Sequence, residues 1–202
     1  MSPARHAPAR AGRGMEQTLS EHARRVKETT SDIPAGCVDS EPWICLHGAP
    51  VLLTELLTPD RVKVPLGSHT KDEVLRELVR LAARDLDPSV IEPILAAVRE
   101  REQVLSTGIG GGIAIPHGKT PVVDQLIAAA GVAAQPIDFD ALDGRPVQVF
   151  FLLIGPESAS GAHVKALSRI SRLLRRDPLR RDLREAENGD AFLRLIHDSE
   201  AA

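Results

Sequence analysis

The spacing of apolar residues predicts alternating helices and strands from Val51 onward. A short apolar turn or helix comes first, formed by Leu52, Leu53, Leu56 and Leu57. A strand follows, in which apolar residues stand at alternate positions: Val62, Val64 and Leu66. Pro65 marks it as an edge strand, because proline has no N–H to donate to a central ladder.

Two longer helices are predicted by their caps as well as by their apolar faces. Thr70 and Glu73 form a capping box. The helix that they open has its apolar face on Val74, Leu75, Leu78, Leu81 and Ala82. Asp87 and Pro88 give the second helix an N-cap and a proline at its first position. The inner face of that helix comprises Val90, Ile91, Ile94, Leu95 and Val98. We expect this helix to end near Arg101.

Two apolar runs, 126–134 and 147–154, are expected to be the central strands of a sheet. The second is apolar at nearly every position, which is typical of a strand buried on both faces. A flexible connector over residues 158–162 then leads to a helix with His163 in its first turn. The inner face of this helix is expected to comprise Val164, Leu167, Ile170, Ser171 and Leu174. A last helix carries Phe192, Leu193, Leu195 and Ile196. Such alternation indicates an α/β domain with helices packed over a central sheet.

Composition fits one domain of this kind with an extension. Of the 202 residues, 43% are hydrophobic, which is enough for a core, and 2% are aromatic, so aliphatic side chains must fill it. The net charge of −3 argues against general nucleic-acid binding. No apolar run has the length of a membrane span. We therefore expect no nucleic-acid partner and no direct membrane insertion.

The first part of the chain, residues 1–48, lacks this periodicity and is expected to be a disordered extension. Its early arginines among Ala, Pro and Gly faintly resemble a transit segment, an alternative that composition favours less. The domain is expected to cover residues 49–198, with 199–202 as a tail. We hypothesise that the natural domain begins near Val51.

The candidate chemistry is concentrated in one stretch, residues 101–119. Four glycines there permit positive φ and close approach to the backbone: Gly108, Gly110, Gly111 and Gly112. Successive N–H groups in such a loop can form an anion-binding nest. A short buried strand should follow and end at Pro116, which cannot continue a central ladder. His117 would then lie just past a strand end, with Gly118 removing bulk beside the imidazole and Lys119 adding positive charge.

A histidine in this setting can act as a nucleophile. Its ordinary pKa of about 6.5 leaves much of it neutral, and a neutral ring nitrogen can attack phosphorus. Arginine suits phosphate because its planar fork donates two hydrogen bonds; the nearby cations are Arg99, Arg101 and Lys119. From the residues alone, a glycine turn before Pro-His is as often structural as functional. Arg101 is likewise as often a solvated surface charge as a functional residue. The loop lacks the Gly-Lys-Ser/Thr ending of a Walker A motif.

The block Ser-Thr-Gly-Ile-Gly-Gly-Gly-Ile-Ala-Ile-Pro-His-Gly-Lys, residues 106–119, resembles the enzyme IIA domain of the bacterial phosphotransferase system. The likeness is to its fructose–mannitol class and within it to the nitrogen-related regulatory branch, and it runs from about residue 51 to 196. In the family, the histidine of Ile-Pro-His accepts the phosphoryl group, which maps to His117. An assisting arginine maps to Arg101, and a second histidine in a His-x-x-x-Leu setting maps to His163.

The resemblance implies a mixed sheet between helical layers and a cytoplasmic phosphoryl carrier without cofactor or metal. An HPr-like protein would be the donor, and Arg101 and His163 would stabilise the group on His117. The expected phosphate-binding loop comprises Thr107, Gly108, Gly110, Gly111 and Gly112. The receiver would be a regulatory target protein or, in fructose or mannitol uptake, an enzyme IIB.

Two other classes of function stay open at this point. A metal-dependent hydrolase would use His117 and His163, although neither has an acidic or cysteine co-ligand at the usual spacing. A pure binding module would leave the histidine inert. The arginines between residues 169 and 184 are either a docking surface or a solvated face of mixed charge.

Overall fold

One mixed sheet forms the middle layer of the computed structural model, which describes residues 52–201. The prediction for residues 1–48 therefore lies outside the described residues. The strands are β1 (Val62–Leu66), β2 (Gly108–Gly110), β3 (Ile113–Ala114), β4 (His117–Lys119), β5 (Ile127–Ile137) and β6 (Val147–Gly155). The helices are α2 (Leu53–Leu56), α3 (Lys71–Ala82), α4 (Ile91–Val104), α5 (Ser160–Leu173), α6 (Asp177–Arg184) and α7 (Gly189–Ala201). Short 3-10 turns cover Pro59–Arg61, Pro88–Val90 and Glu157–Ala159.

The strand order is β1-β5-β6-β3-β2, with β4 also paired to β6. The pairs of β6 with β3 and β4, and of β1 with β5, are parallel, whereas β5–β6 and β2–β3 are antiparallel. In β6 every residue except Gln148 is buried. The prediction of a strand covered on both faces is thus confirmed, as is the edge position of β1.

The strand before His117 ends at Ala114, just before Pro116, as expected, but a new strand begins at His117 itself. β3 pairs Ile113 with Val149, and β4 pairs His117 with Leu153, so the register along β6 is the same on both sides of the proline. Proline lacks a donor but keeps its carbonyl, which accepts a hydrogen bond from the Leu153 N–H at 3.0 Å. His117 therefore opens β4, which continues along β6 after the two residues Ile115 and Pro116.

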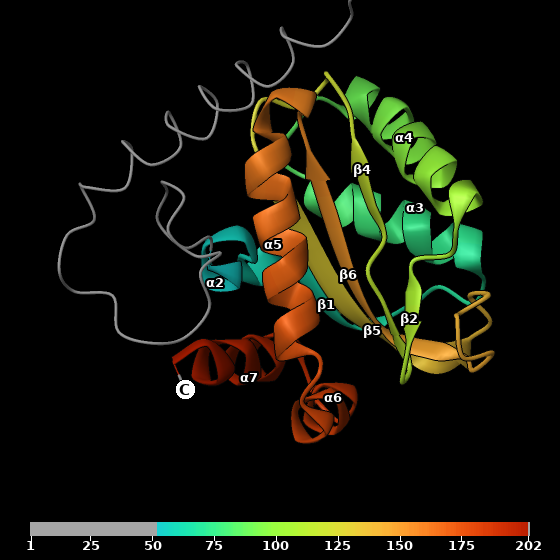
Figure 1. The fold of residues 1–202 in the computed structure, drawn as a ribbon, viewed down its shortest axis with the longest axis vertical. Helices are drawn as coiled ribbons and strands as arrows, with labels where there is room; N and C mark the ends of the chain where they lie inside the picture. The colour runs from blue at the N-terminus through green and yellow to red at the C-terminus, as the bar shows by residue number, and fades with distance from the viewer. Residues whose placement is uncertain (1–51, 202) are drawn as a thin grey trace, which may run out of the picture. The chain divides into compact units, whose positions relative to one another are not determined.

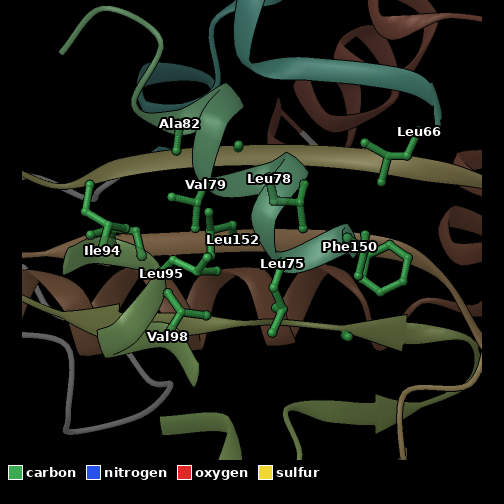
Figure 2. Packing of buried hydrophobic residues seen from close by; sticks show 14 of the residues in the cluster. Leu66, Leu75, Leu78, Val79, Ala82, Ile94, Leu95, Val98, Phe150 and Leu152 are labelled. Atoms are coloured by element: carbon green, nitrogen blue, oxygen red, sulfur yellow. The ribbon is translucent and has the colours of Figure 1, made fainter. Parts of the chain in front are cut away.

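Helices cover both faces of the sheet, so the predicted α/β sandwich is confirmed (Figure 1). On one face, α3 and α4 enclose a core with the sheet; on the other, α2, α5, α6 and α7 enclose a second core. Figure 2 shows the first core, where apolar side chains of both helices meet those of β1 and β6, among them Leu66, Leu75, Leu78, Ile94, Leu95, Phe150 and Leu152. Within residues 52–201, none of the helices combines the length and apolar character that a membrane span requires.

The capping box of α3 is confirmed, whereas the start and the inner face of α5 differ from the prediction. The Thr70–Glu73 capping box opens α3 as predicted. The segment expected to be a flexible connector instead forms a 3-10 turn and the start of α5. The inner face of α5 holds His163, Ala166, Ile170 and Leu173. Val164, which was expected there, is 61% exposed.

The end of the domain also differs from the expected tail at residues 199–202, because α7 continues to Ala201. The carboxylate of Glu200 accepts hydrogen bonds from the backbone N–H groups of Leu53 and Thr54 at 2.9 and 3.1 Å. It also forms an ion pair with Arg169 at 2.8 Å. Glu200 thus satisfies the free N–H groups at the start of α2, which has no cap of its own.

Candidate active site

The imidazole of His117 is held by two hydrogen bonds that define its tautomer. The Nδ1 atom lies 2.8 Å from the Ile115 carbonyl oxygen. Since a carbonyl only accepts, Nδ1 carries the proton. The Nε2 atom accepts a hydrogen bond from Arg101 Nε at 3.1 Å. The ring is therefore neutral, with its lone pair on Nε2, the nitrogen beside the guanidinium.

Arg101 reaches this position because α4 packs closely against β4. The residue lies in the last turn of α4, three positions before its end, and its Nη1 donates to the Leu105 carbonyl at 3.0 Å. A side chain on Gly118 would place a Cβ 3.1 Å from the Val98 nitrogen and 3.2 Å from the Ala97 carbonyl carbon. Gly118 was expected to free space beside the imidazole; its contacts show instead that it admits the backbone of α4.

His163 lies beside His117, as the resemblance implied. The two ring centroids are 5.9 Å apart, with 56° between the ring planes. His163 is 2% exposed, and neither ring nitrogen has a hydrogen-bond partner among residues 52–201. Gly155 gives it room, because a Cβ there would lie 3.2 Å from Nδ1. Two unpaired buried nitrogens are uncommon, and the ring that carries them lies next to His117.

Burial and neighbouring cations keep both histidines neutral. Burial lowers the pKa of His163 to about 4, and the nearby His117 and Lys119 add to the effect. Burial also lowers the pKa of His117; Arg101 and Lys119 lower it further, while the Ile115 carbonyl and Glu102 partly oppose them. At neutral pH the site therefore presents an uncharged nucleophile and an uncharged neighbour, both within a positive field.

The lowered pKa of His163 predicts a loss of stability in acid. The folded pKa of about 4 lies below the ordinary value of 6.5, so the unfolded chain takes up a proton first as the pH falls. Between pH 7.5 and 5.0 this one residue should lower the free energy of unfolding by about 2 kcal/mol. Urea unfolding of the wild type and of His163→Leu at both pH values measures the difference. An equal loss in both proteins would contradict the prediction.

A buried carboxylate, Glu102, supports the site, although the sequence analysis did not single it out. Glu102 is 6% exposed and accepts hydrogen bonds from the Thr107 N–H at 3.0 Å and from the Thr107 hydroxyl at 2.5 Å. It also forms an ion pair with Lys71 at 3.0 Å. The Thr107 carbonyl accepts from the Ile115 N–H at 3.0 Å, so this network fixes the segment just before His117. The signal was present, because Glu102 follows Leu95 and Val98 on the inner face of α4.

The glycines of the expected phosphate-binding loop do not lie near His117, which corrects that prediction. Gly110, Gly111 and Gly112 have φ of +90°, +62° and +78° and form the turn between β2 and β3. His117 is five positions after Gly112 along a segment that keeps one register with β6, which corresponds to about 16 Å of extended chain. Figure 1 shows β2 and β4 toward opposite ends of this side of the sheet. Gly108 pairs with Ala114 inside the hairpin.

The other expected cations are placed differently from Arg101. Arg99 pairs with Asp72 of α3, its Nε lying 2.7 Å from the carboxylate. Lys119 donates to the Ser160 hydroxyl at the start of α5, at 2.9 Å. Within the described residues, no three His, Cys, Asp or Glu side chains form a group that could hold a metal ion. The hydrolase alternative thus finds no ligand set there.

Known proteins are similar to this chain in sequence and in fold. The nitrogen regulatory protein of Bradyrhizobium diazoefficiens is 35% identical over 144 residues, covering 71% of this chain and 94% of that protein. The fructose-specific EIIABC component of the PTS system of Bacillus subtilis is 38% identical over 145 residues, 72% of this chain but 23% of that protein. The chain thus spans less than a quarter of the length of that second relative.

The same relationship appears among solved structures and family models. The crystal structure of nitrogen regulatory protein IIA-Ntr from Neisseria meningitidis matches with a TM-score of 0.66 and 28% identity, covering 71% of this chain and 98% of that one. The family model described as "Phosphoenolpyruvate-dependent sugar phosphotransferase system, EIIA 2" matches residues 55–199. Since this match covers most of the chain, the protein belongs to the EIIA type 2 family of the phosphoenolpyruvate-dependent sugar phosphotransferase system.

Proposed function

We propose that the chain is a cytoplasmic phosphohistidine carrier whose His117 takes a phosphoryl group on Nε2. The donor is a phosphohistidine on a small protein resembling HPr, or on its nitrogen-branch counterpart. As the Nε2–P bond forms, the donor's N–P bond breaks and the donor imidazole leaves with the electron pair. The observation that carries this proposal is the pair of hydrogen bonds on the ring, to Ile115 and from Arg101. They leave the lone pair on Nε2.

The Nδ1 proton has a defined part in this step. It stays on the ring, donated to the Ile115 carbonyl. The phosphorylated ring carries a positive charge, which the carbonyl dipole stabilises. No base is needed, because the attacking nitrogen has no proton to lose. Membership of a phosphoryl-transfer family supports this chemistry.

Arg101 and His163 complete the proposed mechanism by stabilising the phosphoryl oxygens. In the resting site Arg101 Nε donates a hydrogen bond to the lone pair of His117 Nε2. The guanidinium must therefore turn to the phosphoryl oxygens as the new N–P bond forms. Its planar fork suits that task. The ring nitrogens of His163 have no hydrogen-bond partner among residues 52–201, and its pKa is about 4, so a neutral N–H can donate to an oxygen without adding charge.

The proposed output is regulatory: the two phosphorylation states bind target proteins differently. This reading is supported by the B. diazoefficiens nitrogen regulatory protein, which is matched over 94% of its length. A second candidate is transfer to an enzyme IIB in sugar uptake, which the 38% identity to the fructose-specific component of B. subtilis supports. Adding a fructose-type enzyme IIB to the phosphorylated protein separates the two, because discharge of the phosphate to it would favour uptake.

The carrier role is tested by reconstitution. Enzyme I, an HPr-type donor from either branch and phosphoenolpyruvate are mixed with the protein, and the product is kept alkaline to preserve phosphohistidine. Mass spectrometry should find one phosphate, on His117. Phosphorus–nitrogen couplings in NMR spectra of protein with ¹⁵N-labelled histidine should assign it to Nε2. No phosphate from a donor that charges another carrier, or phosphate on Nδ1, would contradict the proposal.

A further inference from the structure

The glycine turn and the arginines of α6 enclose a pocket at the end of the sheet away from His117. Its volume is about 540 Å³, within the range of small-molecule sites. Figure 1 shows α6 beside the end of the sheet where β2 lies. The pocket is lined by Gly111 and Gly112 of the turn, by Arg145, and by Arg180, Arg181 and Arg184 of α6.

The lining of this pocket is strongly positive. It contains four arginines against one aspartate, a formal charge of +3. Arg180 pairs with Asp177, and Arg181 lies 4.0 Å from Asp182. No carboxylate lies within ion-pair distance of Arg145 or Arg184 in the range 52–201. Arg184 Nε donates to the Arg180 carbonyl at 3.2 Å, and Asp143 interacts electrostatically with Arg145. The other N–H groups of the two guanidinium groups can donate to a negatively charged ligand.

The glycines of the turn bring the arginines close to the backbone. A Cβ on Gly111 would lie 2.8 Å from Arg180 Nη1, and one on Gly112 would lie 3.4 Å from Arg184 Nη1. The Gly111 N–H is already donated to Asp143 at 2.9 Å, so the turn itself is not a free anion nest. Because the two glycines have no side chains, the guanidinium groups of Arg180 and Arg184 can pack directly over the turn.

We propose that this pocket binds a phosphorylated small molecule with at least two negative charges, of the class of nucleoside diphosphates. Arginine forks on two sides, from α6 and from Arg145, suit the oxygens of adjacent phosphates. Pro136 and Pro146 provide an apolar wall for the rest of the molecule. The pocket volume is too large for a single phosphate and fits a nucleotide. The site is independent of His117 and of the carrier role.

Titration calorimetry and NMR spectroscopy test the proposal with three probes: ADP, inorganic pyrophosphate and inorganic phosphate. ADP should bind with one-to-one stoichiometry, more weakly at higher salt, and should shift the amide signals of Gly111 and Gly112. Arg184→Gln and Arg145→Gln should each weaken binding about tenfold, since each removes a charge-assisted contact. Arg172→Gln, an exposed arginine of α5 outside the pocket, should bind ADP like the wild type.

Other outcomes would overturn the proposal. Equal affinity for pyrophosphate and ADP would assign the site to the phosphates and remove the nucleoside part of the claim. An equal loss in Arg172→Gln would show non-specific attraction to surface charge. Shifts confined to the signals around Gly118 would place the anion at His117. Binding of an acidic peptide at Gly111 and Gly112, with none of ADP at millimolar concentration, would identify a protein-docking surface instead.

Discussion

Replacement of His117 by alanine is expected to abolish phosphorylation by the HPr-type donor. Alanine has no lone pair, and no other described histidine has the same setting. His163 is buried with a pKa of about 4, and His197 is exposed beside Asp198, 3.5 Å away. The incorporation of ³²P from phosphoenolpyruvate through enzyme I and the donor measures the loss. It should fall to background even after long incubation, because the acceptor atom is missing.

The matched control for this variant is His197→Ala, which should be phosphorylated like the wild type. The His117 variant loses the hydrogen bond to Ile115, so its thermal unfolding is measured beside its activity. Full phosphate incorporation in a folded His117→Ala protein would show that another residue is the acceptor. That result would refute the proposed mechanism at its central step.

Replacement of Arg101 by alanine is expected to slow phosphoryl transfer by about 100-fold while leaving His117 the acceptor. Arg101 Nε lies 3.1 Å from His117 Nε2, so the guanidinium is in reach of the oxygens on which negative charge gathers during transfer. Arg101→Lys should be intermediate, because lysine keeps the charge but not the planar fork. Rapid-quench measurement of a single turnover from phosphorylated donor gives the rate.

The pH profile of the same variant distinguishes an effect on His117 from a loss of folding. Arg101 lowers the pKa of His117, so its removal should raise that pKa and move the acidic limb of the transfer rate to higher pH. Arg99→Ala on the same helix is the control, because Arg99 pairs with Asp72 and should leave both rate and profile unchanged. Equal rates for Arg101→Ala and Arg99→Ala would contradict the proposed role of Arg101.

The elements of this fold were readable from the sequence where the signal is local. Thr70 and Glu73, three positions apart, form the capping box that their spacing predicts. The run in β6 indicated burial on both faces, and it is buried. The pairing of Arg101 with His117 is a long-range contact, and only resemblance to a family could supply it. Spacing alone left Arg101 as one charge among several.

The predictions that were wrong, the position of the glycine turn and the inner face of α5, depended on contacts between distant parts of the chain. Positive φ at Gly110, Gly111 and Gly112 could be expected, but which end of the sheet their turn occupies depends on the pairing of β3 with β6. The spacing of apolar residues placed Val164 on the inner face of α5, whereas that face includes His163. Burial of a histidine with no hydrogen-bond partner runs against the usual cost of such burial, and the site beside it explains the exception.

The contact of Glu200 with the first turn of α2 has a consequence for how this domain is used in longer proteins. The backbone of Leu53 lies 2.9 Å from the Glu200 carboxylate, so the points where the chain enters and leaves the domain are neighbours. A unit whose entry and exit points adjoin can be spliced into another polypeptide without stretching either connection. Sequence similarity to this chain covers 23% of the fructose-specific component of B. subtilis and 94% of the B. diazoefficiens regulator. A similar sequence thus makes up nearly all of one relative and about a quarter of another, and adjoining entry and exit points suit both arrangements.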